Sequence, residues 1–176
     1  MAKRPRIDEY LFVDGYNIIN SWDIFEVMRS EKLEESRDYL KNILVEYSAY
    51  SGIKIILVFD AHLVKGNSGT VERVNGLKIV YTQELETADH YIERSITKLA
   101  RKKRVRVATS DKLEQEIILS RGATRLSARE LKDEIFTSRM LVEKNRLVKN
   151  QQNDYHFGGL DEKNKNRLEK YLKKNN

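Results

Sequence analysis

Five carboxylates in this sequence share one feature: each stands at, or shortly after, the end of an apolar run. They are Asp14, Asp60, Glu86, Asp89 and Asp111. If the runs are parallel strands, their carboxyl ends share one edge of a sheet, where α/β proteins bind ligands. Like charges gathered there raise one another's pKa values unless a cation neutralises them. Because carboxylate oxygens suit hard divalent ions, the pattern predicts a site for Mg²⁺ or Mn²⁺.

Each acid also has a purely structural interpretation. Asp111 stands where a helix begins and could only cap it, while Asp89 could complement a helix dipole. Asp60 and the dipeptide Asp14-Gly15 fit tight turns. One shared edge explains all of these acids together, and we therefore favour a metal site over several separate structural explanations.

The elements that would position these acids alternate along the chain. Short apolar runs predict strands at 10–14, 53–60, 77–81 and 104–109, and a short fifth strand at 124–126. Apolar residues at helical spacing predict helices at 33–50, 88–101 and 112–120. Ser127 and Glu130 have the spacing of a capping box and predict the start of one more helix. The alternation is typical of a three-layer α/β domain, with helices flanking a central, mainly parallel sheet.

The chain divides into three predicted parts. These are an N-terminal extension at 1–9, the α/β domain at 10–147 and a basic C-terminal tail at 148–176. Within the tail, polar residues predict a linker at 148–160, followed by a short helix at 161–173. The segment 61–76 is rich in Gly and Asn and predicts a loop inside the domain.

Composition excludes several classes of protein. The chain has no cysteine, which removes disulfide frameworks, thiolate metal sites and thiol nucleophiles. No apolar run approaches the roughly 20 residues of a membrane span, and the basic start MAKRPRIDEY lacks a signal-peptide core, so a cytoplasmic protein is expected. The net charge is +6, and from Leu141 onward nine Lys or Arg stand against five acids. This cationic bias is compatible with nucleic acid as a partner.

Other chemistries find little support. The sequence has no GxGxxG, Walker or GxSxG motif, so no organic cofactor or serine nucleophile is predicted. The three histidines lack metal-ligand spacing. A phosphoacceptor receiver domain, suggested by Asp60 with Thr109, would need paired acids after the first strand and a lysine after the fifth. The sequence supplies neither.

Two further features of the sequence each have a structural and a functional interpretation. Tyr16 and Trp22 follow the first predicted strand and could pack in the core or stack on bases. The run from Arg101 through Lys102 and Lys103 to Arg104 lies at a predicted helix end. There it could complement the helix dipole or contact RNA.

Four stretches, taken together, resemble the YacP-like branch of the NYN domains, within the PIN-like nuclease superfamily. They are VDGYNII (13–19), IILVFDAHLVKG (55–66), ELETADHYIER (84–94) and VATSDKLEQ (107–115). The likeness runs in order from about residue 10 to 145 and is less distinct in the tail. It implies a PIN-like fold and a metal-dependent ribonuclease activity.

The resemblance also implies roles for individual residues. Asp14, Asp89 and Asp111 would be metal-binding catalytic acids, and Asn17 would help to orient Asp14. We expect Mg²⁺ or Mn²⁺ to activate a water for attack on phosphorus, with Asp60 or Glu86 as secondary acids. Family likeness further implies an endoribonuclease that associates with ribosomes and cuts mRNA during translation.

Single-stranded RNA is therefore the expected substrate. Lys65, Arg73, the basic tail and the residues Arg101, Lys102 and Lys103 are the expected contacts for its phosphates. The alternative is a binding module that has a nuclease-like fold and docks on RNA or ribosomes without cutting. Carboxylates that face phosphates argue against a pure binder, because their charge would repel the ligand.

Overall fold

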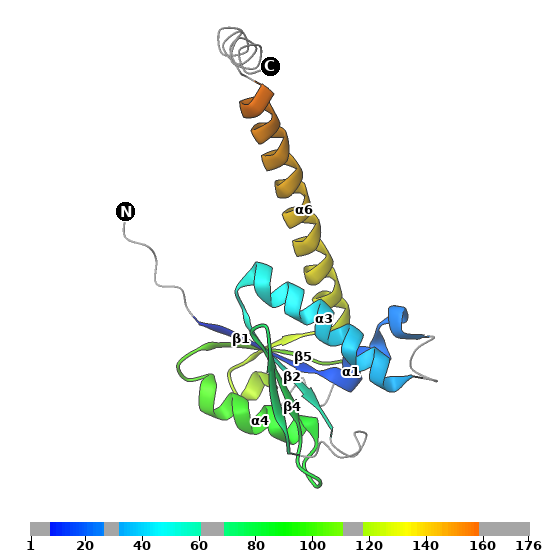
Figure 1. Ribbon diagram of the computed structural model, residues 1–176. Coiled ribbons are helices and arrows are strands. Elements are labelled where there is room, and N and C mark those ends of the chain that lie inside the picture. Colours follow the sequence, from blue (N-terminus) through cyan, green and yellow to red (C-terminus); the bar gives the residue numbers. More distant parts are fainter. Residues whose placement is uncertain (1–7, 27–31, 61–68, 111–117, 159–176) are drawn as a thin grey trace, which may run out of the picture. The chain divides into compact units, whose positions relative to one another are not determined.

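The computed structural model describes residues 8–26, 32–60, 69–110 and 118–158 (Figure 1). The chain forms two compact units, residues 1–138 and 139–176. The first contains the whole sheet, and the described part of the second is the end of one helix. None of the described helices is long and apolar enough to cross a membrane.

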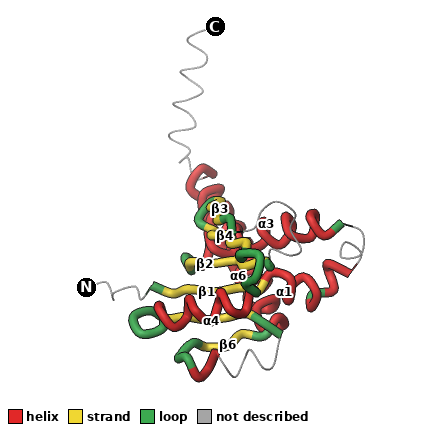
Figure 2. Tube along the Cα trace, turned by 90° about the horizontal axis from the view of Figure 1, so that it is seen from below, coloured by secondary structure: helices red, strands yellow, loops and turns green. Residues whose placement is uncertain are grey.

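Six strands form one sheet in the order β3-β4-β2-β1-β5-β6, and Figure 2 shows strands of this sheet lying side by side, behind α4 (Ala88–Leu99). They are β1 (Glu9–Asp14), β2 (Lys54–Phe59), β3 (Val71–Val74), β4 (Leu77–Tyr81), β5 (Arg104–Ala108) and β6 (Thr124–Leu126). All neighbouring pairs are parallel except β3 with β4. The mainly parallel sheet is confirmed.

The strand order places β1 at a switch point. From β1 the chain moves outward through β2 to β4, and then returns to β5 on the other side of β1. In open α/β sheets, ligands bind outside the carboxyl ends of the strands where the direction of winding reverses. We call this side of the sheet the carboxyl edge and the opposite side the amino edge. Asp14, the last residue of β1, lies at the carboxyl edge beside the switch point.

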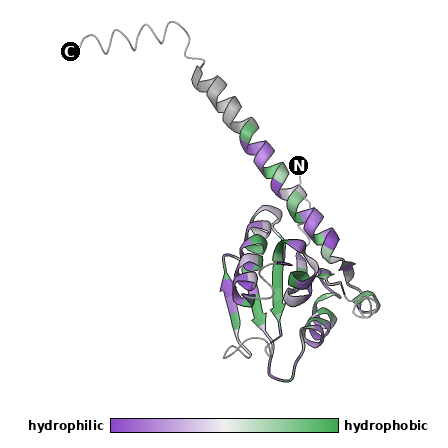
Figure 3. Ribbon diagram, turned by 90° about the vertical axis from the view of Figure 1, so that its right-hand side faces the viewer, coloured by the Kyte–Doolittle hydropathy of each residue, from purple (hydrophilic) through white to green (hydrophobic). Residues whose placement is uncertain are grey.

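Helices cover both faces of the sheet. The described helical elements are α1 (Gly15–Ser21), the 3-10 turn η1 (Asp23–Phe25), α3 (Leu33–Ser51), α4 (Ala88–Leu99) and α6 (Ala128–Gly158). Leu11 and Val13 of β1 pack into a core with α1, α3 and the start of α6, whereas Phe12 packs against α4 on the other face. Figure 1 shows α3 and α4 on opposite sides of the sheet, and Figure 3 shows the strands as largely hydrophobic. The predicted three-layer arrangement is confirmed.

The predicted starts of α4 and α6 are also confirmed. In a reciprocal capping box, the Ser127 backbone N–H donates to Glu130 Oε2 at 2.7 Å, and the Glu130 N–H donates to Ser127 Oγ at 3.2 Å. Thr87 caps α4, because its Oγ1 accepts from the His90 backbone N–H. The predicted helix at 112–120 is described only at its end, where residues 118–120 are helical. The predicted helix at 161–173 lies outside the described residues.

Three segments differ from the sequence predictions. The predicted loop at 61–76 contains β3, which turns into β4 at Asn75 (φ 47°) and Gly76 (φ 90°), the pair favoured in tight hairpins. All four residues of β3 are exposed, so the strand lacks an apolar signature. Helix α1 was not predicted, because its seven residues are too short for a clear period.

The third difference is the predicted linker at 148–160. Its described part, up to Gly158, is the last portion of α6. No proline or glycine interrupts the sequence between Ala128 and Phe157, and polar residues alone do not end a helix. The backbone therefore stays helical where composition suggested a linker.

Candidate functional site

Asp14 occupies the centre of the carboxyl edge. It ends β1, flanked by β2 and β5, and it is also the N-cap of α1. Its Oδ1 accepts a hydrogen bond from the Asn17 backbone N–H at 3.1 Å. Only 8% of the residue is exposed. A carboxylate therefore lies almost fully buried at the switch point of the sheet.

Gly15 is required by close packing. A Cβ atom built on Gly15 would lie 2.2 Å from Cε1 of Phe59, at the end of β2. Gly15 does not have a positive φ, so the tight turn that we expected from the Asp14-Gly15 pair is not its role. The chain passes directly into α1, and the missing side chain lets the Phe59 ring press against the start of that helix.

Two further acids act on Asp14 through their charge. The pKa of Asp14 is raised to about 7, first because the carboxyl is buried and then because Asp89 and Asp60 are negative nearby. The hydrogen bond from the Asn17 backbone opposes this rise only in part. The structure thus brings Asp14, Asp60 and Asp89 within electrostatic reach of one another, from β1, the end of β2 and the first turn of α4.

Asp60 is engaged with the backbone. Its Oδ1 accepts from the Ala88 N–H, the first residue of α4, at 2.6 Å. Asp89 is the next residue of that helix and is exposed. Asp60 therefore fixes the start of the helix that carries Asp89, which gives it a positioning role that the sequence did not reveal.

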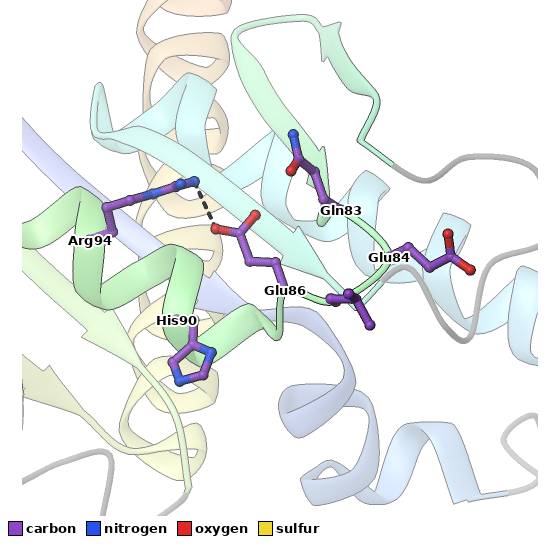
Figure 4. Close-up of a pocket in the computed structure, with 6 residues that line it drawn as sticks. Gln83, Glu84, Glu86, His90 and Arg94 are labelled. Carbon is purple, nitrogen blue, oxygen red and sulfur yellow. Dashed lines mark ion pairs between the residues drawn. The ribbon is translucent and has the colours of Figure 1, made fainter.

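Glu86 is turned toward a cation. Its carboxylate forms an ion pair with Arg94 at 2.7 Å, drawn as the dashed line in Figure 4. The pair lines an open cavity of about 920 Å³, together with Gln83, Glu84 and His90. Of the two secondary acids, Glu86 therefore already has a side-chain partner.

Asn17 connects Asp14 to the segment that contains Asp111. Its backbone N–H holds Asp14, while its side-chain Oδ1 accepts from the Ser110 N–H at 2.7 Å. The Ser110 hydroxyl lies 2.9 Å from the Ser21 hydroxyl at the end of α1. Asp111 itself lies outside the described residues, but its predecessor is tied to α1 beside Asp14.

The donors fit a hard divalent ion in kind. They are oxygen atoms from acids at the carboxyl edge, and the buried charge of Asp14 is the type that a cation stabilises. Among the described residues, no three Asp, Glu or His side chains form a group that could hold a metal ion. A metal site at this edge would therefore need a ligand from outside the described residues, and Asp111 follows Ser110 directly.

Four of the basic residues predicted to contact RNA are described, and they lie away from Asp14. Arg101 and Lys102 are exposed just before β5, and Lys103 pairs with Asp8 at 2.6 Å just before β1. Because β1 and β5 are parallel, all three lie at the amino edge, away from Asp14. Arg73 is exposed on the edge strand β3. Lys65 lies outside the described residues.

The aromatic residues after β1 belong to the core. Trp22 is 2% exposed, and its Nε1 donates to the Ala128 carbonyl at 2.8 Å. The Tyr16 ring packs against Phe59 with 5.0 Å between centroids, and its hydroxyl accepts from Arg37. Both side chains therefore pack in the core, and neither is placed to stack on a base.

The sequence patterns did not predict that basic residues line a cavity at one side of the carboxyl edge. A cavity of about 620 Å³ lies there, where the ends of α1, β5 and β6 meet the start of α6. Its lining includes Ser21, Ser110, Arg125 and Arg129. No local motif joins residues more than 100 positions apart, but the predicted strand at 124–126 already placed Arg125 next to this edge.

Comparison with known proteins agrees with the likeness noted in the sequence. The model of the YacP-like NYN domain family matches residues 11–173, which includes the tail where the likeness looked weak. The protein named YacP from Bacillus subtilis (strain 168), described as uncharacterized, is 42% identical over 141 residues. The match covers 77% of this chain and 80% of that protein.

Solved structures give the same result. The crystal structure of Rae1 (YacP) from Bacillus subtilis has a TM-score of 0.70 at 35% identity, covering 93% of this chain and 94% of that one. A point mutant of the same protein has a TM-score of 0.69 at 36% identity, covering 81% and 84%. The chain belongs to the YacP-like NYN domain family.

Proposed function

We propose that this protein is an endoribonuclease that cleaves single-stranded RNA and depends on Mg²⁺ or Mn²⁺. One observation carries the proposal. Asp14 is buried at the switch point of a nuclease-like fold, with a pKa of about 7 that reflects both burial and the charges of two neighbouring acids. Perturbed carboxylates of this kind gather at catalytic sites, because a purely structural site would pair them.

Each acid of the carboxyl edge then has a role. Asp14, Asp89 and Asp111 would hold the ion, while Asp60 positions Asp89 through the start of α4. A divalent ion bound there would supply Lewis acidity and a water of lowered pKa for attack on phosphorus. Asn17 is a positioning residue, since it holds the Asp14 carboxylate with its backbone and the Ser110 backbone with its side chain.

The substrate is proposed to be mRNA on translating ribosomes in the cytoplasm. This part rests on family likeness and on the net charge of +6, which favours association with RNA. Cleavage of a defined mRNA with and without translating ribosomes would test it. Equal cleavage of free and translated mRNA would contradict a dependence on the ribosome.

The Asp14→Asn variant tests the activity directly. Asparagine keeps an oxygen that can accept the Asn17 N–H, so the start of α1 is retained while the charge is lost. We expect cleavage of single-stranded RNA to fall by about a thousandfold or more, and EDTA to abolish it in the wild type. Product formation on denaturing gels measures both.

The matched control is Asp8→Asn, an acid at the amino edge of the same sheet. It should cleave RNA like the wild type. Undiminished cleavage by purified Asp14→Asn protein would overturn the assignment. Tight RNA binding by the wild type without any product would instead support the alternative of a non-catalytic RNA-binding module.

A further inference from the structure

Two cavities lie along the carboxyl edge, and they differ in charge. The cavity beside β4 and α4 contains Glu84, Glu86 and a single arginine, Arg94, which is already paired with Glu86. The cavity beside β6 and the start of α6 contains Arg125, Arg129 and Lys132, with one acid, Asp133. A polyanion that reaches the edge is therefore attracted to one side and repelled from the other.

The cationic cavity is close to the acids of the carboxyl edge. Ser110, which lines it, donates its backbone N–H to Asn17, and the Asn17 N–H donates to Asp14. Two hydrogen bonds thus link the cavity wall to the buried carboxylate. Parallel pairing of β5 with β6 brings Leu126 opposite Ala108, so the residues after both strands meet at this edge.

The cations differ in how strongly they are engaged. Lys132 forms an ion pair with Asp23 and helps to hold the start of α6. Arg129 lies 4.0 Å from Asp133, and both side chains are highly exposed, an arrangement that contributes little free energy. Arg125 is exposed on the edge strand β6. The Arg129 guanidinium can therefore turn toward a ligand without dismantling the fold, and the exposed Arg125 side chain lines the same cavity.

The polar wall suits phosphate groups. The Ser21 and Ser110 hydroxyls, 2.9 Å apart, stand beside the arginines. Ser21 donates its O–H to the Asn17 carbonyl at 2.7 Å, so Ser110 is the hydroxyl that can turn its proton toward a phosphate oxygen. Arginine binds phosphate with two parallel hydrogen bonds. Trp22 also lines the cavity but is 2% exposed, so its ring is not available for base stacking.

We propose that this cavity, through Arg125 and Arg129, binds the backbone phosphates of single-stranded RNA next to the cleaved bond. This inference rests on the proposed function and adds a direction to it. The RNA strand runs from the acids of the carboxyl edge over β5 and β6 toward the start of α6. It does not run over β4 and β3, nor across the basic residues 101–103 of the amino edge.

The test uses the double variant Arg125→Ala/Arg129→Ala in an Asp14→Asn background with Mg²⁺ present. Binding of a labelled single-stranded oligoribonucleotide is followed by fluorescence anisotropy over a range of salt concentrations. We expect affinity to fall by about tenfold or more. The slope of log K against log salt should decrease by about 1.4, since two phosphate contacts are lost.

Two matched variants complete the design. Arg101→Ala/Lys102→Ala removes two exposed cations from the amino edge and should leave affinity within about twofold of the parent. Arg125→Lys/Arg129→Lys keeps the charge and should retain most of the salt slope while losing affinity, because lysine cannot make the paired hydrogen bonds. Thermal unfolding verifies that every variant is folded.

The outcomes separate this inference from the proposed function. Parent-like binding by the Arg125/Arg129 variant, equal losses in the amino-edge control, or no binding by the parent would overturn the inference. Cleaved oligonucleotide in the Asp14→Asn background would overturn the proposed active site and leave the binding comparison intact.

Discussion

The two edges of the sheet treat their acids in opposite ways. At the amino edge, Asp8 lies 3.3 Å from Lys54 and 2.6 Å from Lys103, and these cations lower its pKa. At the carboxyl edge, burial and neighbouring acids raise the pKa of Asp14 to about 7. Asp8 immediately precedes β1 and Asp14 ends it, so the two acids are six positions apart, or about 20 Å in an extended chain. The contrast lies in their surroundings, because the two acids mark the opposite ends of the same strand.

A second group at the amino edge shows how thoroughly this fold can neutralise charge. Arg106 of β5 donates to both oxygens of Glu134 in α6, at 2.8 and 3.0 Å, and its Nε lies 2.6 Å from Glu9. Tyr47 of α3 donates its hydroxyl to the same Glu134. One arginine thus ties the sheet to helices on one face, and each acid in the group has a cation.

The difference between the two edges shows which one lowers the stability of the folded protein. A fold that supplies Arg106 to two acids at one edge surrounds Asp14 with further acids at the other. A cation bound beside Asp14 would restore the free energy that is lost there. Charge pairing thus distinguishes the structural edge of the sheet from the edge that we assign to catalysis.

The largest expected effect comes from Asp14 in metal-free protein. Its pKa is raised from 3.8 to about 7 on folding, so the folded state holds the proton more tightly than the unfolded state. Its contribution to stability is therefore present below about pH 4 and lost as the pH rises to about 7. The loss is on the order of 4 kcal/mol. Asp14→Asn should remove this loss and be more stable than the wild type at pH 8, in EDTA.

Urea unfolding at pH 5 and pH 8 measures the effect. The gain of Asp14→Asn should be larger at pH 8, and Mg²⁺ should stabilise the wild type much more than the variant. A wild-type protein whose stability rises from pH 5 to pH 8 relative to Asp14→Asn would contradict this picture of the carboxyl edge.

The next largest effect is expected at Glu134, where the sign of the pH dependence is reversed. Its pKa is lowered, first by the hydrogen bonds from Arg106, so its contribution is present above its ordinary value of 4.5 and lost as the pH falls. Glu134→Gln breaks the paired contact with Arg106 and should cost about 1–3 kcal/mol at neutral pH. RNA cleavage by the folded variant should remain within about twofold of the wild type.

Urea unfolding and initial cleavage rates test this separation. For the unfolding measurement, Asp133→Asn on the same helix is a control, because Asp133 is exposed and lies 4.0 Å from a still more exposed Arg129. A large loss of cleavage by folded Glu134→Gln protein would show that the amino edge and the carboxyl edge are not independent.

The features of the two edges that depend on strand order could be predicted from the sequence. Buried strands have a clear apolar signature, and acids that end parallel strands must share an edge, so the meeting of Asp14, Asp60 and Asp89 was predictable. The same rule places Arg101 and Lys102, which precede a strand, at the opposite edge. Their distance from Asp14 could therefore have been predicted from the sequence.

Other features depend on contacts that no pattern encodes. The hydrogen bond from Ala88 to Asp60 and the ion pair of Glu86 with Arg94 are set by side-chain geometry in three dimensions. The link from Asn17 to Ser110 spans 93 residues. Strand β3 escaped prediction because all of its residues are exposed, and α1 because it is short.

The smallest effect is expected at Asp8, the acid that opened the comparison. Its two lysine partners are surface groups, and exposed ion pairs contribute little because water and salt screen them. Asp8→Asn should therefore lower the unfolding midpoint less than Glu134→Gln at low salt, and not measurably at about 1 M salt. Thermal unfolding at both salt concentrations measures this. If Asp8→Asn lowered the unfolding midpoint as much as Glu134→Gln, ion pairs at the amino edge would stabilise the fold outside the Arg106 group as well. The two edges would then differ by more than the burial of Asp14 explains.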